Sequence, residues 1–222
     1  MRVLLVGGLG LIGYSLCCQL IEEEIDVFAL DNVSNEHNDK EERLLQIGRN
    51  AFFQYSSLET DYRTKKEKFD VIIYCLYDPI DRQDNMNMGN NIELEKHLKN
   101  ALDYSRDYGS KFMLVSGSKE SGVRLTENDN EKRPFSEKDD GKLYFIQEQL
   151  VIEAFKDKGE QFSIVRLNFD DIEIENVNQI KTFHLYQTKE KSIFQMTTSS
   201  NGTGEGLGII TDWLQNNWNR ED

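Results

Sequence analysis

Three glycines near the start of the chain have the spacing of a diphosphate-binding turn. Gly7, Gly10 and Gly13 follow a short apolar run. At the end of a strand, the first such glycine permits a tight turn and the second lets the backbone approach a pyrophosphate. The third lets the next helix pack close to the sheet. The diphosphate then lies at the positive end of that helix, which begins near Leu11. A Walker loop is excluded, because no Lys-Ser or Lys-Thr pair follows the glycines.

An acidic residue follows at the distance where a dinucleotide site needs one. Asp31 ends the second apolar run, about 20 residues beyond the glycines, where a carboxylate can bind the hydroxyls of the adenosine ribose. The same carboxylate disfavours a 2′-phosphate. The glycines and Asp31 together predict a site that binds NAD in preference to NADP. A tight turn in an α/β fold that binds no nucleotide is the alternative interpretation.

Strand and helix patterns alternate along the chain, and these elements must position the turn and the aspartate. Apolar runs predict strands at 2–7, 26–32, 51–57, 69–77, 111–118 and 162–169. Helical spacing of apolar residues predicts helices at 11–24, 91–109 and 143–159. Because the strands are apolar on both faces, they belong in a parallel sheet that helices cover on both sides. We therefore expect a doubly wound, Rossmann-like α/β fold with a mostly parallel sheet.

The alternating pattern weakens beyond residue 170. Segments 183–187 and 192–198 fit a strand pair, and 206–218 fits an amphipathic helix. The acidic cluster at 170–175 favours a solvated strand edge over a calcium loop. We expect residues 1–169 to form the NAD-binding domain and residues 170–222 to form a short extension packed on that domain.

Composition limits the partners of this 222-residue chain. The net charge is −14, with 40 acidic against 26 basic residues, which argues against nucleic acid and against an anionic membrane as partners. No segment is apolar for long enough to span a bilayer, and glycines interrupt the first apolar run, unlike in a secretion signal. We therefore expect a cytoplasmic protein.

The cysteines and histidines predict no metal site. Cys17, Cys18 and Cys75 lack the spacing of a disulfide framework or of a set of metal ligands. Buried thiols in a reducing compartment are therefore expected. The three histidines are scattered, with no second ligand at metal spacing.

Several of these features occur in one order along the chain. The glycine turn, Asp31, the apolar run 69–77, Asn91, "FMLVSGS", Tyr144 and "SIVRLN" follow one another from residue 7 to residue 168. In this order the chain resembles the extended short-chain dehydrogenase/reductase family, in the branch of nucleotide-sugar epimerases and dehydratases. The resemblance implies NAD as cofactor. The residues expected to bind it are Gly7, Gly10, Leu11, Ile12, Gly13, Asp31, Asn32, Ser57, Leu58, Cys75, Leu76, Tyr77 and Asn91.

The resemblance also implies a catalytic set, from which this chain departs. Tyr144 matches the family's general acid/base, but Glu148 occupies the position of the lysine that lowers the pKa of that tyrosine. A like charge opposes ionisation, so Glu148 is expected to raise the pKa of Tyr144. The position of the family's catalytic serine or threonine hydroxyl aligns with Gly117, which lies between Ser116 and Ser118. If the alignment moves by one residue, one of these two serines supplies the hydroxyl. The polar residues around Glu148 favour a solvent-exposed helix position.

Two functions stay open on these residues. One is an epimerase/dehydratase-like enzyme that acts on a nucleotide sugar or similar small molecule through Tyr144. The other is a catalytically silent dinucleotide-binding sensor, regulator or partner subunit. Only 53 residues follow Phe169, so the substrate region is open, reduced, or completed by a partner chain. The resemblance further implies a homodimer that pairs helices 91–108 and 143–158.

Overall fold

The computed structural model describes most of the chain up to residue 168 and four short strands beyond it. The described ranges are 1–33, 38–59, 68–76, 89–118, 140–156, 161–168, 174–176, 179–180, 184–187 and 193–197. Within the described part, none of the helices is long and apolar enough to cross a bilayer.

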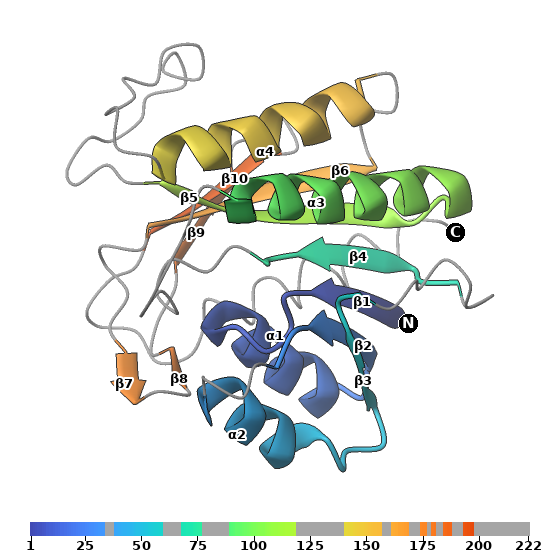
Figure 1. The fold of residues 1–222 in the computed structure, drawn as a ribbon, viewed down its shortest axis with the longest axis vertical. Helices are drawn as coiled ribbons and strands as arrows, with labels where there is room; N and C mark the ends of the chain where they lie inside the picture. Colours follow the sequence, from blue (N-terminus) through green and yellow to red (C-terminus); the bar gives the residue numbers. More distant parts are fainter. Residues whose placement is uncertain are drawn as a thin grey trace.

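The described strands form one large sheet and one separate pair (Figure 1). The large sheet has eight strands in the order β3-β2-β1-β4-β5-β6-β10-β9 within the described residues. Its strands are β1 (Arg2–Val6), β2 (Asp26–Asp31), β3 (Phe53–Ser57), β4 (Val71–Tyr74), β5 (Lys111–Ser118), β6 (Phe162–Asn168), β9 (His184–Gln187) and β10 (Ile193–Thr197). Neighbouring strands run parallel except β9, which is antiparallel to β10. The separate pair is β7 (Ile174–Asn176) and β8 (Gln179–Ile180).

Helices cover both faces of this sheet. They are α1 (Leu11–Glu22), α2 (Asn38–Ile47), α3 (Gly89–Tyr108) and α4 (Asp140–Ala154) in the described residues. In β1, Val3 and Leu5 pack into a core with residues of α1 and α2, whereas Leu4 and Val6 pack into a second core with residues of α3 and α4. In Figure 1, α3 and α4 lie side by side. Two buried faces explain why β1 is a continuous apolar run, and the doubly wound expectation is confirmed.

The order of the strands reverses direction at one point in the sheet. The chain passes from β1 through β2 to β3 in one direction and then from β4 through β5 to β6 in the other. Ligands of open α/β sheets bind outside the carboxyl ends of the strands where the order reverses. Here that point lies between β1 and β4, which pair directly from Val3 and Val71 onward.

Several boundaries differ from the sequence expectations. The run 69–77 forms a strand only over β4, and the helix expected at 143–159 begins at Asp140 and is described to Ala154. The strand pair in the C-terminal part is confirmed, and β10 additionally joins the main sheet beside β6. The expected helix at 206–218 lies outside the described residues.

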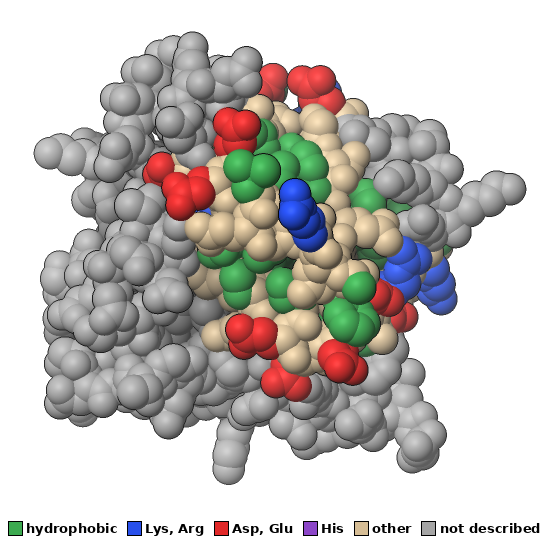
Figure 2. Space-filling view, turned by 90° about the horizontal axis from the view of Figure 1, so that it is seen from below, with side chains coloured by type: hydrophobic (Ala, Val, Ile, Leu, Met, Phe, Trp, Pro, Cys, Tyr) green, Lys and Arg blue, Asp and Glu red, His purple; other side chains and the backbone are tan. Residues whose placement is uncertain are grey.

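The face around α2 carries mostly acidic charge. Figure 2, which looks at the molecule from the α2 end of Figure 1, shows small apolar patches among acidic side chains that outnumber the basic ones. Leu45 is the exposed apolar residue of α2 with the largest exposed fraction, 74%. This distribution follows the net charge of −14.

Candidate functional site

The glycine turn connects the end of β1 to the start of α1 and packs against the end of β4. Gly7 has a φ of +91°, in the region that favours glycine. A Cβ there would lie 2.5 Å from the Cα of Leu76 and 2.6 Å from the carbonyl oxygen of Cys75. Its amide donates to the carbonyl of Leu30 on β2 (2.7 Å). The turn therefore fills the space between β2 and β4, and only a glycine fits at position 7.

The first turn of α1 lies directly over the glycine turn. A Cβ on Gly13 would lie 2.0 Å from the carbonyl oxygen of Gly7. Gly10 is the N-cap residue, with extended backbone and no side-chain cap, and its carbonyl accepts the first helical hydrogen bond, from Tyr14 (2.7 Å). A helix that starts without a side-chain cap presents its N-terminal amides and its positive end to a ligand. This geometry fits the diphosphate of a dinucleotide.

Two buried thiols, of Cys17 and Cys75, contact the backbone of the glycine turn from the protein core. Cys75 lies within hydrogen-bonding distance of the carbonyls of Val6 (3.4 Å) and Gly7 (3.6 Å), and Cys17 of the carbonyl of Gly8 (3.4 Å). Burial raises the pKa of the Cys17 thiol, which keeps its proton available for donation. Cys75 thus packs in the core beneath the turn.

Asp31 connects the glycine turn to β2 and α2. Its Oδ2 accepts hydrogen bonds from the amides of Leu9 (2.8 Å) and Gly10 (3.2 Å). Its Oδ1 accepts from the amide of Asn32 (2.8 Å) and from Nζ of Lys40 (2.9 Å). The side chain of Asp31 is 2% exposed and that of Lys40 is 27% exposed. The carboxylate expected at the adenosine ribose is therefore also a structural support of the turn.

The next predicted residues lie beside Asp31 at the ends of β2 and β3. Asp31 and Ser57 are register partners in these strands. Oδ1 of Asn32 accepts hydrogen bonds from the Ser57 hydroxyl and from the Leu58 amide, both at 3.2 Å. The Leu58 amide also donates to the carbonyl of Asp31 (3.1 Å). The structure thus brings Asp31, Asn32, Ser57 and Leu58 together next to the glycine turn.

Two basic residues of α2, which are not among the predicted site residues, join this group. Besides Lys40, Arg43 is 1% exposed, and its Nη1 donates to the carbonyl of Leu9 in the turn (2.7 Å). The two residues are three apart on a helix, so they lie on neighbouring positions of one face. That spacing, on the helix that follows Asp31, is the signal in the sequence that could have identified them.

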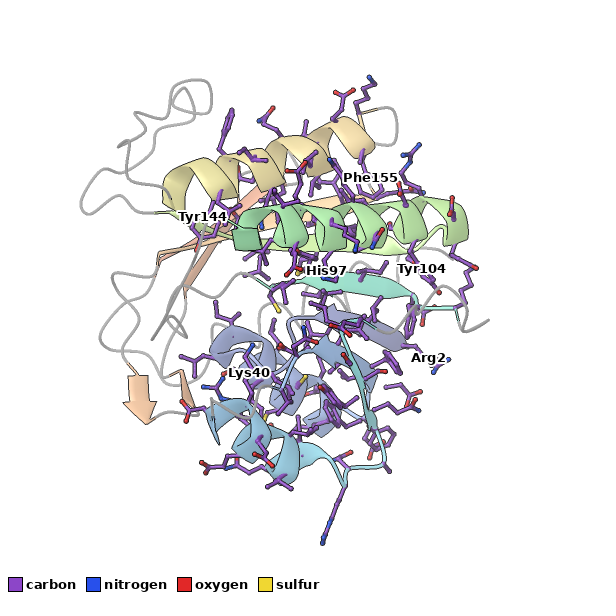
Figure 3. All side chains as sticks on the ribbon, in the orientation of Figure 1. Arg2, Lys40, His97, Tyr104, Tyr144 and Phe155 are labelled. Carbon is purple, nitrogen blue, oxygen red and sulfur yellow. The ribbon has the colours of Figure 1, made fainter. Side chains whose placement is uncertain are left out.

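Tyr144 also lies near the carboxyl ends of the strands, on the side of the sheet that α3 and α4 cover. It is 1% exposed and packs with Leu94 of α3, Leu143 of α4 and Leu76, which follows β4. The hydroxyl of Tyr74 donates to the carbonyl of Leu94 (2.8 Å) and attaches α3 to β4. Figure 3 shows Tyr144 near the start of α4 and Lys40 near the start of α2, both toward the edge where β4 ends.

Glu148 is buried, which corrects the expectation of a solvent-exposed position. It is 2% exposed, and its Oε1 accepts a hydrogen bond from the hydroxyl of Ser116 at the end of β5 (2.7 Å). Gln147 beside it is 1% exposed. The polar residues next to Glu148 in the sequence did not reveal its burial, because the helical turn of α4 that contains Glu148 packs on β5 and α3.

The remaining predicted residues are described only in part. Ser118 and Asn91 lie in β5 and α3, but their side chains are outside the described part, as is Tyr77 as a whole. In the described ranges, no group of three or more His, Cys, Asp or Glu residues could hold a metal ion.

A model described as the NAD dependent epimerase/dehydratase family matches residues 3–168, which is more than half of the chain. None of the curated proteins compared with the chain matches it significantly.

Solved structures with the same fold include two enzymes crystallised with NAD. UDP-glucuronic acid 4-epimerase from Bacillus cereus, in complex with UDP-glucuronic acid and NAD, is 20% identical with a TM-score of 0.57, over 75% of this chain and 56% of that chain. dTDP-glucose 4,6-dehydratase from Bacillus anthracis, in complex with NAD, is 13% identical with a TM-score of 0.58. The match covers 75% of this chain and 54% of that chain.

A third similar structure covers more of the chain. Pal from Bacillus thuringiensis is 15% identical with a TM-score of 0.55, over 97% of this chain and 64% of that chain. The chain thus spans less than two thirds of the length of each of the three structures. At these identities the likeness shows a common fold.

Proposed function

Because this chain belongs to the NAD-dependent epimerase/dehydratase family, we propose that it binds NAD and acts on a nucleotide sugar or a similar small molecule. NAD is the cofactor of this family. In the proposal, Tyr144 is the acid/base residue and the substrate lies over it, at the carboxyl edge of the sheet.

The observation that carries the proposal is the intact glycine turn. The close approaches at Gly7 and Gly13 and the uncapped start of α1 fit a diphosphate. The turn and the N-terminal amides of α1, at Leu11, Ile12 and Gly13, would hold the diphosphate. The group at Asp31 and Asn32 would hold the adenosine ribose. When bound, NAD supplies a hydride acceptor for a carbon of the substrate.

The chain's own contribution to catalysis would be proton transfer at Tyr144. The phenol would hold or release the proton of a substrate hydroxyl while the leucines around it exclude water. Glu148 gives no positive charge to stabilise a phenolate. Without that charge, proton transfer at Tyr144 would be slower at neutral pH than at a tyrosine paired with lysine.

The proposed substrate class is supported by the family and by two of the similar structures, UDP-glucuronic acid 4-epimerase and dTDP-glucose 4,6-dehydratase. UDP-glucuronic acid and dTDP-glucose are both nucleotide sugars. We further propose that residues 170–222 form a short extension that packs on the NAD-binding domain of residues 1–169. A second copy of the chain in a homodimer would pair α3 and α4 with their counterparts.

The Ser116–Glu148 hydrogen bond favours a second candidate, a silent dinucleotide-binding sensor, regulator or partner subunit. A hydroxyl at the end of β5 donates to a carboxylate at the position where the family has lysine. In this candidate the site retains NAD binding, but proton transfer at Tyr144 does not occur.

Reduction of bound NAD distinguishes the two candidates. The protein is saturated with NAD, a panel of UDP- and dTDP-sugars is added at stoichiometric concentration, and the absorbance of reduced nicotinamide is followed. We expect reduction in the wild type and none in Tyr144→Phe. Tyr108→Phe, the same change at an exposed tyrosine of α3, is the matched control and should behave as the wild type. Tight NAD binding without any reduction would leave the silent candidate. Equal reduction in Tyr144→Phe would remove the tyrosine from the reaction.

A further inference from the structure

The carboxylate of Asp31 has its full set of hydrogen bonds within the chain itself. Three backbone amides and one ammonium donate to it, at distances from 2.8 to 3.2 Å. A carboxylate accepts about four hydrogen bonds. The hydroxyls of a bound adenosine ribose therefore have to replace one of these four donors.

Lys40 is the donor that a ribose can replace. The other three donors are amides of the glycine turn and of the end of β2, which the backbone fixes in place. Lys40 reaches Asp31 through a flexible side chain that is 27% exposed, from the first turn of α2. When a ribose hydroxyl takes its place on Oδ1, the ammonium of Lys40 remains beside the ribose.

The charge at this end of the site differs from that of an aspartate alone. Asp31 contributes one negative charge, whereas Lys40 and the buried Arg43 contribute two positive charges to the same group of residues. A carboxylate by itself repels a 2′-phosphate, and a basic residue nearby accommodates one. The expectation that Asp31 makes the site prefer NAD to NADP therefore does not take account of the basic residues of α2.

We infer that Lys40 determines the specificity for the 2′ substituent of the dinucleotide, and that it makes the site accept NADP nearly as well as NAD. Lys40 competes with the ribose hydroxyls for Asp31, and this competition weakens the binding of NAD. Its ammonium can also bind a 2′-phosphate, and this contact strengthens the binding of NADP. This inference rests on the proposed dinucleotide site.

Calorimetric titration with NAD and NADP tests the inference without any turnover. In the wild type, the two dissociation constants should differ by less than about tenfold. Lys40→Met should weaken NADP by about tenfold or more, because a charge-assisted hydrogen bond is lost, and should leave NAD unchanged or tighter. Arg49→Met, which removes an exposed positive charge beyond the end of α2, is the matched control and should change neither constant.

Two further measurements keep the result interpretable. The melting temperature of each ligand-free variant shows whether it folds, and Lys40→Gln replaces Lys40→Met if the latter does not. Titration with 5′-AMP and with adenosine 2′,5′-bisphosphate examines the ribose end alone and should reproduce the dependence on Lys40. If the wild type bound NADP about a hundredfold more weakly than NAD, or if Lys40→Met lost equal affinity for NAD and NADP, the inference would be overturned while the proposed function would stand. Failure of both dinucleotides to bind would overturn the proposed function and the inference together.

Discussion

At the scale of single residues, position 148 determines the charge that lies one helical turn from Tyr144. A lysine there would favour the phenolate, and a carboxylate disfavours it. Glu148 is buried against Ser116, so solvent does not screen this charge as it would at the surface. The effect on Tyr144 should therefore be measurable.

Substitution of Glu148 should change the ionisation of Tyr144. We expect Glu148→Gln to lower the pKa of Tyr144, and Glu148→Lys to lower it further. The measurement is ultraviolet titration of each variant, with the same variant carrying Tyr144→Phe subtracted to isolate one phenol. Identical titration curves in all three backgrounds would mean that the side chains at 144 and 148 do not interact.

Some of these residues could be predicted from the sequence and others could not. Asp31 and Ser57 end consecutive strands of a parallel sheet, and Leu58 follows the second of them. Because the carboxyl ends of parallel strands meet on one side of a sheet, the proximity of these residues follows from the fold class. The burial of Glu148 depends on which side of α4 faces β5, and a polar neighbourhood in the sequence does not reveal that. Lys40 was missed because its contact with Asp31 depends on where α2 begins.

At the scale of elements, β1, the glycine turn and α1 form one unit whose geometry depends on Gly13. A methyl group there would overlap the carbonyl of Gly7, which is fixed backbone. Gly13→Ala should therefore decrease the free energy of unfolding by about 1–3 kcal/mol, as overpacking does. Ser15→Ala on the same helix is the control and should stay within about 0.5 kcal/mol. Urea denaturation measures both, and an equal effect of the two changes would contradict the close packing at Gly13.

Helix α3 should make the stability of the protein depend on pH through His97. Burial is the main cause that lowers the pKa of this half-buried side chain, and the charge of Lys96 adds to it. The unfolded state, with a histidine pKa of about 6.5, then binds the proton more tightly than the folded state. Stability contributed by neutral His97 is therefore present above about pH 6.5 and decreases as the pH falls below it.

His97→Gln removes this dependence. Between about pH 7.5 and about pH 5.5, the free energy of unfolding of the wild type should decrease more than that of the variant. Urea denaturation at several pH values gives both curves. Parallel curves would show that His97 has the same proton affinity in the folded and unfolded states.

The elements themselves were largely predictable because apolar runs and helical spacing alternate so regularly before residue 170. The extent of α2 was not, since its sequence is mostly polar and only Leu44 and Ile47 pack toward the core. The position of β10 beside β6 was also not predictable. Parallel pairing between distant strands depends on the available sheet edge, which local patterns do not specify.

At the scale of the whole molecule, the chain matches the family over residues 3–168. It spans 56% and 54% of the lengths of the similar epimerase and dehydratase structures. The glycine turn, Asp31 and the strands from β2 to β6 lie within these matched residues. Tyr144 also lies within residues 3–168, whereas β9 and β10 lie beyond them.

Binding of NAD to the purified chain tests the central claim most directly. Calorimetric titration should give a saturable isotherm, and the melting temperature should rise with NAD concentration. At about 100 times the dissociation constant, the ligand should add about 2.7 kcal/mol to the free energy of unfolding. Absence of both a binding isotherm and a rise in melting temperature, at millimolar NAD, would contradict a dinucleotide site at the glycine turn.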